Sequence, residues 1–514
     1  MAKLNKDDLG QMNKSYFQSL PKQRLVEVAT NLHQLAVEQC ERLEKNSSNS
    51  SRPPSTDNPY QKKNKKKEDE DVSSELNNQP EEEEAPQPEN QTSAELRKKA
   101  TKDSEQKRFP GKQLGARGFG RTKPLVVEEI IPHYPDHCTA CNQKLIAKNE
   151  KPYMGYYVLE LKPEKSGFKI ICQLHHYYEL SCECGHKTKA SPGEGYISTV
   201  DGRSVDLQLK EYVLVSPMLA TFIASLSVRY RMSRAKIKEF LWDWAETELS
   251  VGTIDRCIRE AGIACNPVVE TLIEEIQKVE ILHLDETHWK VQSDLQWLWV
   301  AISGKTAVYH IGSRRKEELL HLVTEAFMGW LVTDGYLSYR SYPKRQRCLA
   351  HLIRKAIALT GAVNKKAAQI GSWILNSLKE LITDIANGKD NSSSTVRLNL
   401  SLLKGSCLIG SLDSQKKLQA LGKEILKDWD AVIAFVNNPE LPPTNNEAER
   451  ALRHAVIGRR ISYGTRTSEG SLAYSSLLSV IETCRLRSIN PWIYICEVIK
   501  RARKGLSPPP IPTG

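Results

Sequence analysis

The stretch "ILHLDETHWK", residues 281–290, places an acid, Asp285, directly after a mostly apolar run. Three of the four residues that precede Asp285 are apolar, which is typical of a buried strand. An acid at the end of such a strand has one of two roles: it is a metal ligand, or it is a polar residue where the chain meets water. The segments that follow distinguish between these roles.

A second acid follows a later strand of the same region. The segments predicted as strands are 280–291, 296–304, 306–313 and 329–339, and a helix is predicted at 315–328. Asp334 follows the apolar run "GWLVT" and precedes a Gly-Tyr turn. Adjacent strands that end side by side would bring Asp334 to Asp285. Glu286 is expected on the opposite side of its strand and Asp294 in a turn, so neither is given a role.

Two carboxylates held together repel unless they share a proton or bind a cation. Their oxygens favour Mg²⁺ or Mn²⁺, and two such ions about 3.5–4 Å apart can hold the attacking and the leaving oxygen of a phosphodiester. This chemistry needs a third acid. Glu447 and Glu449 both lie near the start of a helix in "LPPTNNEAERALRHAVIGRR", residues 441–460, which Thr444 or Asn445 would cap. The arginines of this segment suit a phosphate-rich ligand, and they are Arg450, Arg453, Arg459 and Arg460.

Four of the twelve cysteines lie in two short pairs. The pairs are Cys138 and Cys141 in "CTAC", and Cys182 and Cys184 in "CEC". Together they can supply four thiolates to a tetrahedral Zn²⁺ ion, which would be structural because protein fills all its positions. Two alternatives stay open: His186 could replace one thiolate, and Cys172 could be a ligand or a buried thiol. The other cysteines are scattered, which does not predict a disulfide framework.

Residues 230–262 predict two helices joined by a short polar turn, with Ser233 and Ser250 as their N-caps. This arrangement is compatible with a helix-turn-helix, whose second helix would enter a groove of DNA. That helix would offer Thr253, Arg256 and Arg259. Many helical hairpins bind nothing, so a plain hairpin is the alternative.

The N-terminal part of the chain is poor in apolar residues after its first helix. That helix is predicted at 20–44, where the apolar residues have the spacing of a helix that packs on another, in this chain or in a partner. Residues 46–101 cannot support a core and predict a disordered tether. The glycine-rich, basic segment 109–123 predicts an arm along a nucleic-acid backbone, or a plain linker. The formal net charge of +11 favours a polyanionic partner.

Together these segments resemble the insertion-sequence-66 transposases, members of the Asp-Asp-Glu group whose core is ribonuclease-H-like. The resemblance covers nearly the whole chain, and its most specific motifs are "NSSNSSRPPS" and "TNNEAERALR". Other shared motifs are "PGKQLGARG", "LDETHW", "TDGYLSY", "CLAHLIRK", "IGRR" and "SSLLSVIETCRLRSINPWIYI". Leu114 and Ala116 depart from the Pro and His that are more frequent in the family's glycine-rich arm, and the CxC pair departs from the usual spacing.

Carried over by position, the family pattern makes Asp285, Asp334 and Glu449 the three metal-binding acids and leaves Glu447 as a bystander. His351, in "CLAHLIRK", matches a family position and is expected near the site, with a packed histidine as the alternative. The residues between Asp334 and Glu449 exceed what the core needs, which implies a helical insertion.

The resemblance implies a multidomain α/β protein: a ribonuclease-H-like catalytic core with a helical insertion, preceded by a zinc ribbon and a helical DNA-binding segment. The expected parts are a helical segment at 1–45, a linker with the arm at 46–123, the zinc ribbon at 124–195, the helix-turn-helix-like part at 196–275, the core at 276–475 with its insertion at about 360–440, and a C-terminal helical segment with a tail at 476–514.

The implied function is that of an insertion-sequence transposase, which binds the terminal inverted repeats of its element and catalyses metal-dependent strand cleavage and strand transfer. Its cofactors would be Mg²⁺ or Mn²⁺ and structural Zn²⁺. Its partners would be double-stranded DNA of the element ends and the target, further copies of itself, and accessory proteins of the same element. Without a membrane span or a signal peptide, the expected location is the bacterial cytoplasm, at the nucleoid. The alternatives are a zinc-dependent DNA-binding protein that does not cut, and a general nuclease of the same fold.

Overall fold

The computed structural model describes residues 14–43, 125–147, 151–165, 167–200 and 203–513. The chain divides into two units, one made of residues 1–57 and 126–514 and the other of residues 58–125. The predicted tether and glycine-rich arm, within 46–123, lie outside the described residues.

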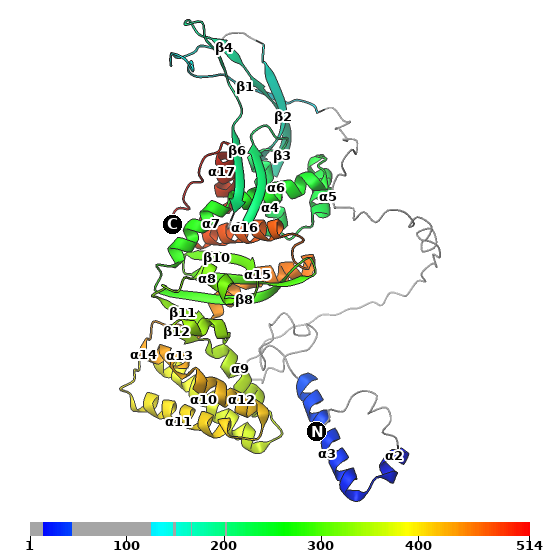
Figure 1. Cartoon of the computed structure of the whole chain (residues 1–514), viewed down its shortest axis with the longest axis vertical. Helices are drawn as coiled ribbons and strands as arrows, with labels where there is room; N and C mark the ends of the chain where they lie inside the picture. The colour runs from blue at the N-terminus through cyan, green and yellow to red at the C-terminus, as the bar shows by residue number, and fades with distance from the viewer. Residues whose placement is uncertain (1–13, 44–124, 148–150, 166, 201–202, 514) are drawn as a thin grey trace, which may run out of the picture. The chain divides into compact units, whose positions relative to one another are not determined.

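A mixed five-stranded sheet contains the "ILHLDETHWK" segment (Figure 1). In spatial order its strands are β10 (Thr306–Gly312), β9 (Asp294–Ser303), β8 (Ile281–Val291), β11 (Trp330–Thr333) and β12 (Arg345–Arg347). The first three along the chain form an antiparallel meander, and the last two run parallel to β8. The strands predicted at 280–291, 296–304 and 306–313 are therefore confirmed.

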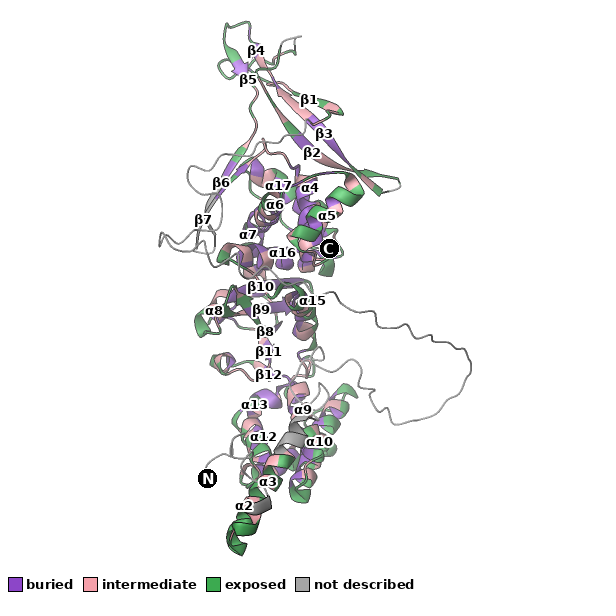
Figure 2. Cartoon of the chain, turned by 90° about the vertical axis from the view of Figure 1, so that its right-hand side faces the viewer, coloured by how far each residue is buried: buried purple, intermediate pink, exposed green. Residues whose placement is uncertain are grey.

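Every residue of β10 is buried, because helix α16 (Ser468–Leu486) packs along this edge of the sheet (Figure 2). Two hydroxyl groups of α16 accept hydrogen bonds from β10 that a further strand would otherwise accept. Ser479 Oγ accepts the backbone N–H of Tyr309 (2.8 Å), and Thr483 Oγ1 accepts that of Ala307 (3.1 Å). An open edge would otherwise present unpaired amides to other chains. This pairing explains why α16 carries hydroxyl side chains on a buried face.

The fourth predicted strand, 329–339, is shorter in the structure. β11 ends at Thr333, and a 3₁₀ helix, η2 (Leu337–Ser341), follows. The reason is the Asp334 side chain, whose Oδ1 accepts the backbone N–H of Tyr336 (2.8 Å) and turns the chain out of the strand. The helix predicted at 315–328 is also shorter, since α8 covers only Lys316–Leu322.

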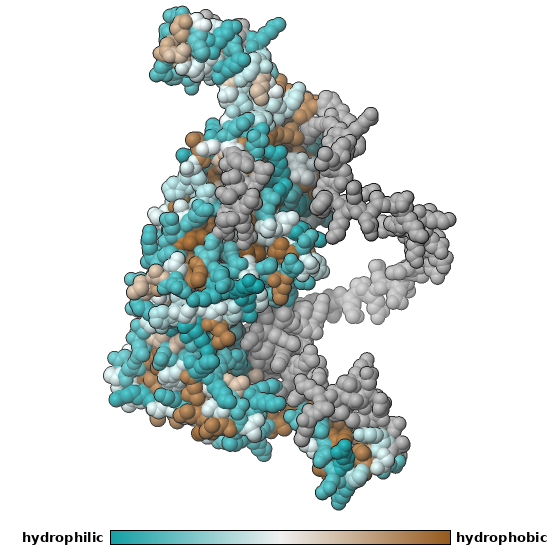
Figure 3. Space-filling view, viewed as in Figure 1, coloured by the Kyte–Doolittle hydropathy of each residue, from teal (hydrophilic) through white to brown (hydrophobic). Residues whose placement is uncertain are grey.

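Helices fill the interval between β12 and the return of the chain to the sheet. They are α9 (Leu349–Thr360), α10 (Lys365–Ala386), α11 (Ser394–Ser411), α12 (Lys416–Lys427), α13 (Trp429–Val432) and α14 (Ala434–Asn437), and α15 (Asn446–Ser462) follows. The first six share an apolar core that includes Leu352, Ile374 and Leu403. Helices therefore fill the interval of the predicted insertion, which is called the insertion below. α11 also exposes Leu398 and Leu402, and Figure 3 shows apolar side chains over this helical region.

A second group of helices packs on α16. It contains α4 (Pro217–Val228), α6 (Val251–Ala264), α7 (Asn266–Ile276) and, from the C-terminal end, α17 (Pro491–Arg503). Helix α5 (Arg234–Ala245) packs on α6 and α4 instead. A buried ion pair ties α17 to α6, because Arg503 donates to the two carboxylate oxygens of Glu260 at 2.6 and 3.1 Å and to Val215 O at 2.8 Å. The segments predicted as separate domains thus contact each other here, and their boundaries stay a prediction.

The part before residue 216 is rich in strands. A three-stranded sheet has the order β1 (Glu129–His133), β3 (Gly167–Tyr177), β2 (Met154–Glu164). Two hairpins follow, β4 (Glu179–Ser181) with β5 (Lys187–Lys189), and β6 (Glu194–Val200) with β7 (Arg203–Lys210). Near the N-terminus, α2 (Lys14–Ser19) precedes α3 (Lys22–Leu43), which corresponds to the helix predicted at 20–44, and the pairing of this helix stays a prediction. Among the described helices, none has both the length and the apolarity to cross a membrane.

Candidate active site

Asp285 lies in the middle of β8, where β8 extends beyond its parallel neighbour β11. The ladder between these strands ends where His283 pairs with Val332. The same offset, continued by two residues, places Asp334 beside Asp285. The expectation of a strand end at Asp285 is wrong, because β9 pairs with β8 as far as Val291.

Gly335, directly after Asp334, makes room for an arginine. A Cβ at this position would overlap the guanidinium of Arg347. Arg347 is buried and donates through Nη2 to Glu424 Oε1 (2.6 Å) on α12. The sequence "TDGY" therefore needs a glycine at this position for packing. Because Gly335 has no side chain, the Arg347 guanidinium can approach the acids from the side of the insertion.

Glu449 lies in the first turn of α15, and Asn445 fixes this helix to β8. Asn445 stands at the N-cap position, but its side chain does not cap the helix. Its Nδ2 donates to Leu284 O (2.7 Å), and its Oδ1 pairs with His283 Nδ1 (3.0 Å). One buried side chain thus positions the helix of the third acid against the strand of the first.

Glu447, the other acid in this turn, faces β8. Its Oε2 lies 3.3 Å from His283 Nε2. Burial lowers the pKa of His283, while the charge of Glu447 and the hydrogen bond to Asn445 raise it. Glu447 therefore helps to hold α15 on the strand, and its role as a bystander to the chemistry stays a prediction.

A cavity of about 800 Å³ lies where the sheet, the insertion and α15 meet. The three acids predicted as metal ligands, Asp285, Asp334 and Glu449, all line it. Its other charged lining residues are Glu286, Glu424, Arg314, Arg347, Arg354, Lys355 and Arg453. A cluster of acids and a set of cations thus share one hollow.

The carboxyl of Asp285 has a pKa raised well above its usual value. Burial is the main cause, and the charges of Glu286, Asp334 and Glu449 raise it further. The backbone N–H of Glu286, which donates to Asp285 Oδ1 at 2.9 Å, opposes the shift. Mutual repulsion of this kind means that the carboxylates lie close together, and a bound cation would relieve it.

Glu286, to which the sequence assigned no role, also borders the cavity and is held by two neighbours. Arg314 donates to its Oε1 through Nε (3.1 Å) and Nη2 (2.6 Å), and the hydroxyl of Tyr339 donates to Oε2 (2.5 Å). The Arg314 guanidinium lies 4.2 Å from the ring centroids of both Trp297 and Tyr336. The two rings and Glu286 thus hold this cation in one orientation. Residue spacing in the sequence did not predict a role for Glu286, because strand pairing brings its partners together.

Glu424 of α12 brings the insertion to the cavity. It accepts Arg347 through Oε1, and Lys355 Nζ lies 2.8 and 2.6 Å from its two oxygens. Arg354 Nη2 lies 3.7 Å from Glu449 Oε2. The insertion therefore contributes both charge and lining to the site, which the sequence did not indicate.

His351, expected near the site, lines the cavity beside Glu449. Its Nδ1 lies 3.8 Å from Glu449 Oε1, and neither atom has a hydrogen-bond partner among the described residues. Burial lowers the pKa of His351, and the charge of Glu449 raises it.

The arginines predicted to contact DNA on α15 differ in their surroundings. Arg450, Arg453 and Arg460 are exposed, and Arg453 also lines the cavity. Arg459 is half-buried and donates to Thr287 Oγ1 (3.0 Å) on β8. The first three are therefore placed for a ligand, whereas Arg459 also helps to position the helix.

The predicted helix-turn-helix contains two helices, α5 and α6, which Ser233 and Ser250 cap as expected. In α6, Arg256 is exposed, whereas Arg259 is bound by Glu469 at 2.9 and 3.0 Å. The second half of α6 is buried against α4 and α16. The first turns of α6 are thus the part that could reach a groove.

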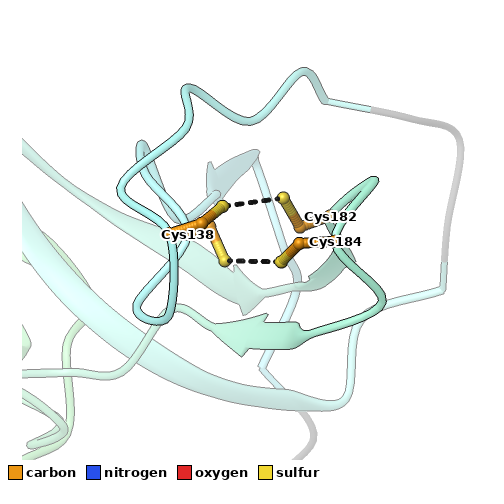
Figure 4. Close-up of side chains that lie close together, drawn as sticks. Cys138, Cys182 and Cys184 are labelled. Atoms are coloured by element: carbon orange, nitrogen blue, oxygen red, sulfur yellow. Dashed lines mark hydrogen bonds between the residues drawn. The ribbon is translucent and has the colours of Figure 1, made fainter.

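The four predicted zinc ligands come together on two turns, and Figure 4 shows Cys182 and Cys184 directed toward the turn of Cys138. The Sγ atoms of Cys138 and Cys184 are 3.7 Å apart, those of Cys141 and Cys182 are 3.5 Å apart, and all four lie within 4.8 Å of one another. This group contains neither His186 nor Cys172.

Each cysteine pair is held by backbone hydrogen bonds within its turn. The N–H of Cys138 donates to Gln143 O (2.9 Å), and that of Cys182 to His186 O (2.8 Å). The His186 ring instead contacts Thr139 Oγ1 through Nε2 (2.8 Å). The hydrogen bond from the backbone of Cys141 lowers the pKa of Cys138 to about 6, whereas hydrogen bonds with Cys182 and Cys184 raise the pKa of Cys141.

Comparison with known proteins shows to which family the chain belongs. The model of the family described as Transposase IS66 family matches residues 213–473, about half of the chain. Three similar proteins come from Sinorhizobium fredii (strain NBRC 101917 / NGR234), and each is named an uncharacterized protein. Protein y4qI is 20% identical over 427 residues, which is 76% of this chain and 74% of its own. Protein y4hP is 23% identical over 295 residues (49% and 53%), and y4jD is 24% identical over 201 residues (35% and 39%). The chain belongs to the IS66 family of transposases.

Proposed function

We propose that this protein cuts the ends of an insertion sequence and joins them to target DNA. The observation that carries the proposal is the meeting of Asp285, Asp334 and Glu449 at one cavity, from three separate elements of the chain. Membership of a transposase family supports the same activity.

The order of the five strands supports a ribonuclease-H-like core. Numbered along the chain from β8, the strands stand in the order 3-2-1-4-5, with the first three antiparallel and the last two parallel to the first. The first and fourth strands are neighbours and carry Asp285 and Asp334, while α15 packs on the first strand with Glu449.

The acids have the properties of a site for Mg²⁺ or Mn²⁺. Glu449 Oε1 is buried without a hydrogen-bond partner among the described residues, and burial and acidic neighbours raise the pKa of Asp285. All three ligands would be carboxylate oxygens, which these ions favour. Bound divalent ions would polarise the scissile phosphate and lower the pKa of the attacking water or 3′ hydroxyl.

Side chains of the chain itself would hold the DNA around the acids. Arg314, Arg354, Lys355 and Arg453 line the cavity and offer positive charge to phosphates on either side of the scissile bond. Arg314 would need little reorganisation, because Glu286 and two aromatic rings already fix it.

We further propose that the four cysteines hold a structural Zn²⁺. Four thiolates at about 2.3 Å from a tetrahedral ion stand about 3.8 Å apart. The two measured Sγ–Sγ distances, 3.5 and 3.7 Å, are close to that value. A zinc ribbon of this kind, the α5–α6 hairpin and the predicted arginines would together bind the terminal inverted repeats as double-stranded DNA.

On this proposal the protein acts in the bacterial cytoplasm, at the nucleoid. Joining two ends to one target favours a homo-oligomer on DNA, and accessory proteins of the same element would assist. Helix α3 is an amphipathic segment that either kind of contact could use.

The test is cleavage and strand joining of a labelled duplex that carries the element's own ends, with Mg²⁺ and any accessory proteins. Asp285→Asn, Asp334→Asn and Glu449→Gln should each abolish cleavage while binding of the ends survives. Asp294→Asn, an exposed acid on the neighbouring strand, is the matched control and should cut like wild type.

Two results would overturn the proposal. Mutants of the three acids that cut as well as wild type would remove these residues from the chemistry. A wild-type protein that binds the ends but never cuts would make it a zinc-dependent DNA-binding protein instead.

A further inference from the structure

A group of metal-binding side chains adjoins the acids at the start of α9. Cys348 directly precedes this helix, His351 lies in its first turn, and Glu449 faces them from α15. One ligand atom from each lies within 4.8 Å of the other two. A thiol and an imidazole distinguish this group from the all-oxygen site, because Mg²⁺ does not favour sulfur or nitrogen.

Two of the three ligand atoms have no other partner. His351 Nδ1 and Glu449 Oε1 are buried, lack hydrogen bonds within the described part of the chain, and lie 3.8 Å apart. Nitrogen and oxygen ligands at about 2.0–2.2 Å from one Zn²⁺ would be about 3.3–4.2 Å apart for bond angles from tetrahedral to linear. The measured separation fits an ion between them and is too long for a hydrogen bond between them.

Burial raises the pKa of the third ligand, Cys348, whereas the backbone N–H of Asn445, which donates to its Sγ at 3.2 Å, lowers it, and the charge of Glu449 raises it again. Cys348 also lies before the first turn of α9, at the positive end of a helix dipole. A bound cation would favour the thiolate over the buried thiol.

We propose that Cys348, His351 and Glu449 bind a borderline transition-metal ion such as Zn²⁺, and that this ion inhibits cleavage because it holds Glu449 away from the Mg²⁺ site. The inhibition rests on the proposed function, whereas the binding does not. Sites with sulfur and nitrogen ligands bind Zn²⁺ far more tightly than Mg²⁺, so the inhibition would persist in excess Mg²⁺.

The binding is tested by the zinc content of the full chain after equilibration with Zn²⁺ and gel filtration, measured by mass spectrometry. Cys348→Ser should hold one equivalent less than wild type, and His351→Gln, a second and independent variant, should show the same loss. Cys407→Ser removes another buried thiol, in α11, and should hold as much zinc as wild type. Equal contents in wild type, Cys348→Ser and His351→Gln would overturn the site.

The inhibition is tested by titrating Zn²⁺ into Mg²⁺-dependent cleavage and comparing each variant with its own zinc-free rate. Wild type and Cys407→Ser should lose about 100-fold, the effect expected when a catalytic group moves by about 1 Å. Cys348→Ser should keep most of its rate, and equal inhibition of it would refute the inhibitory role. If wild type does not cut at all, the proposed function fails, and the zinc contents still decide whether the site exists.

Discussion

Replacement of Asn445 by alanine should loosen α15 from β8. The side chain is 1% exposed, donates to Leu284 O at 2.7 Å and pairs with His283 Nδ1 at 3.0 Å. Alanine leaves a buried carbonyl and a buried ring nitrogen without partners. Each such group costs about 1–3 kcal/mol, and neighbouring losses are not fully additive, so the free energy of unfolding should fall by about 2–4 kcal/mol.

Cleavage should fall by more than the loss of folded protein explains. Glu449 lies one turn after Asn445, so movement of the helix start moves the third acid. A misplacement of about 1 Å in a catalytic group costs about 100-fold in rate. Asn445→Asp should fail as well, because a carboxylate has no proton to donate to Leu284 O.

Stability is measured by urea denaturation followed through tryptophan fluorescence, and the rate by cleavage of a labelled duplex under conditions in which each variant is folded. Asn446→Ala is the matched control, since this neighbour is exposed. The reasoning is refuted if Asn445→Ala unfolds and cuts like wild type. It is also refuted if stability falls while the folded fraction cuts at the wild-type rate, because the residue would then hold the fold without positioning Glu449.

Three further changes test other parts of the structure. The pKa of Asp285 is raised in the folded state, so without metal this state keeps a proton that the unfolded state has released. The free energy of unfolding should therefore fall as the pH rises from the usual carboxyl range toward the raised pKa. Denaturation at several pH values should show this fall, Mg²⁺ should reverse it at the higher pH, and Asp285→Asn should remove both effects. Arg503→Met should lower the free energy of unfolding by about 3–5 kcal/mol, because it leaves the buried Glu260 unpaired; the double variant with Glu260→Gln should recover part of the loss, and no recovery would contradict this cause. Gly335→Ala should cost about 1–3 kcal/mol and lower cleavage, since its Cβ would displace the Arg347 guanidinium; a variant that unfolds and cuts like wild type would show that the arginine can move without cost.

The antiparallel part of the sheet could be predicted because its strands are apolar over most of their length and follow one another closely. The bounds of β11 could not be predicted from the sequence. The run "GWLVTDGYLSY" was predicted as one strand although it contains a Gly-Tyr turn after Asp334, and the bond from Tyr336 N–H to the Asp334 side chain ends the strand there. Apolar residues on both sides of such a turn do not reveal where the strand ends, because a local bond between side chain and backbone decides it.

The site itself was only partly visible in the sequence. Asp285 and Asp334 could be selected because each is an acid after an apolar run. The choice of Glu449 over Glu447 needed the family resemblance, since both lie near the start of one helix. In the structure the two acids differ because Glu447 meets His283 on β8, while Glu449 borders the cavity. That difference depends on how the helix is rotated against the sheet, which helical spacing alone does not fix.

The insertion was predicted as helical from the family resemblance, but its contribution to the charges at the cavity was not. Arg347 is buried, and its Nη1 has no hydrogen-bond partner within the described residues. Nη2 is held at 2.6 Å by Glu424 of α12, which also binds Lys355. Loss of that carboxylate would leave Arg347 and Lys355 without this ion-pair partner beside the acids. On the proposed function, these two cations would then compete with the metal ions for the acids, so Glu424 separates the charge that binds metal from the charge that binds phosphate.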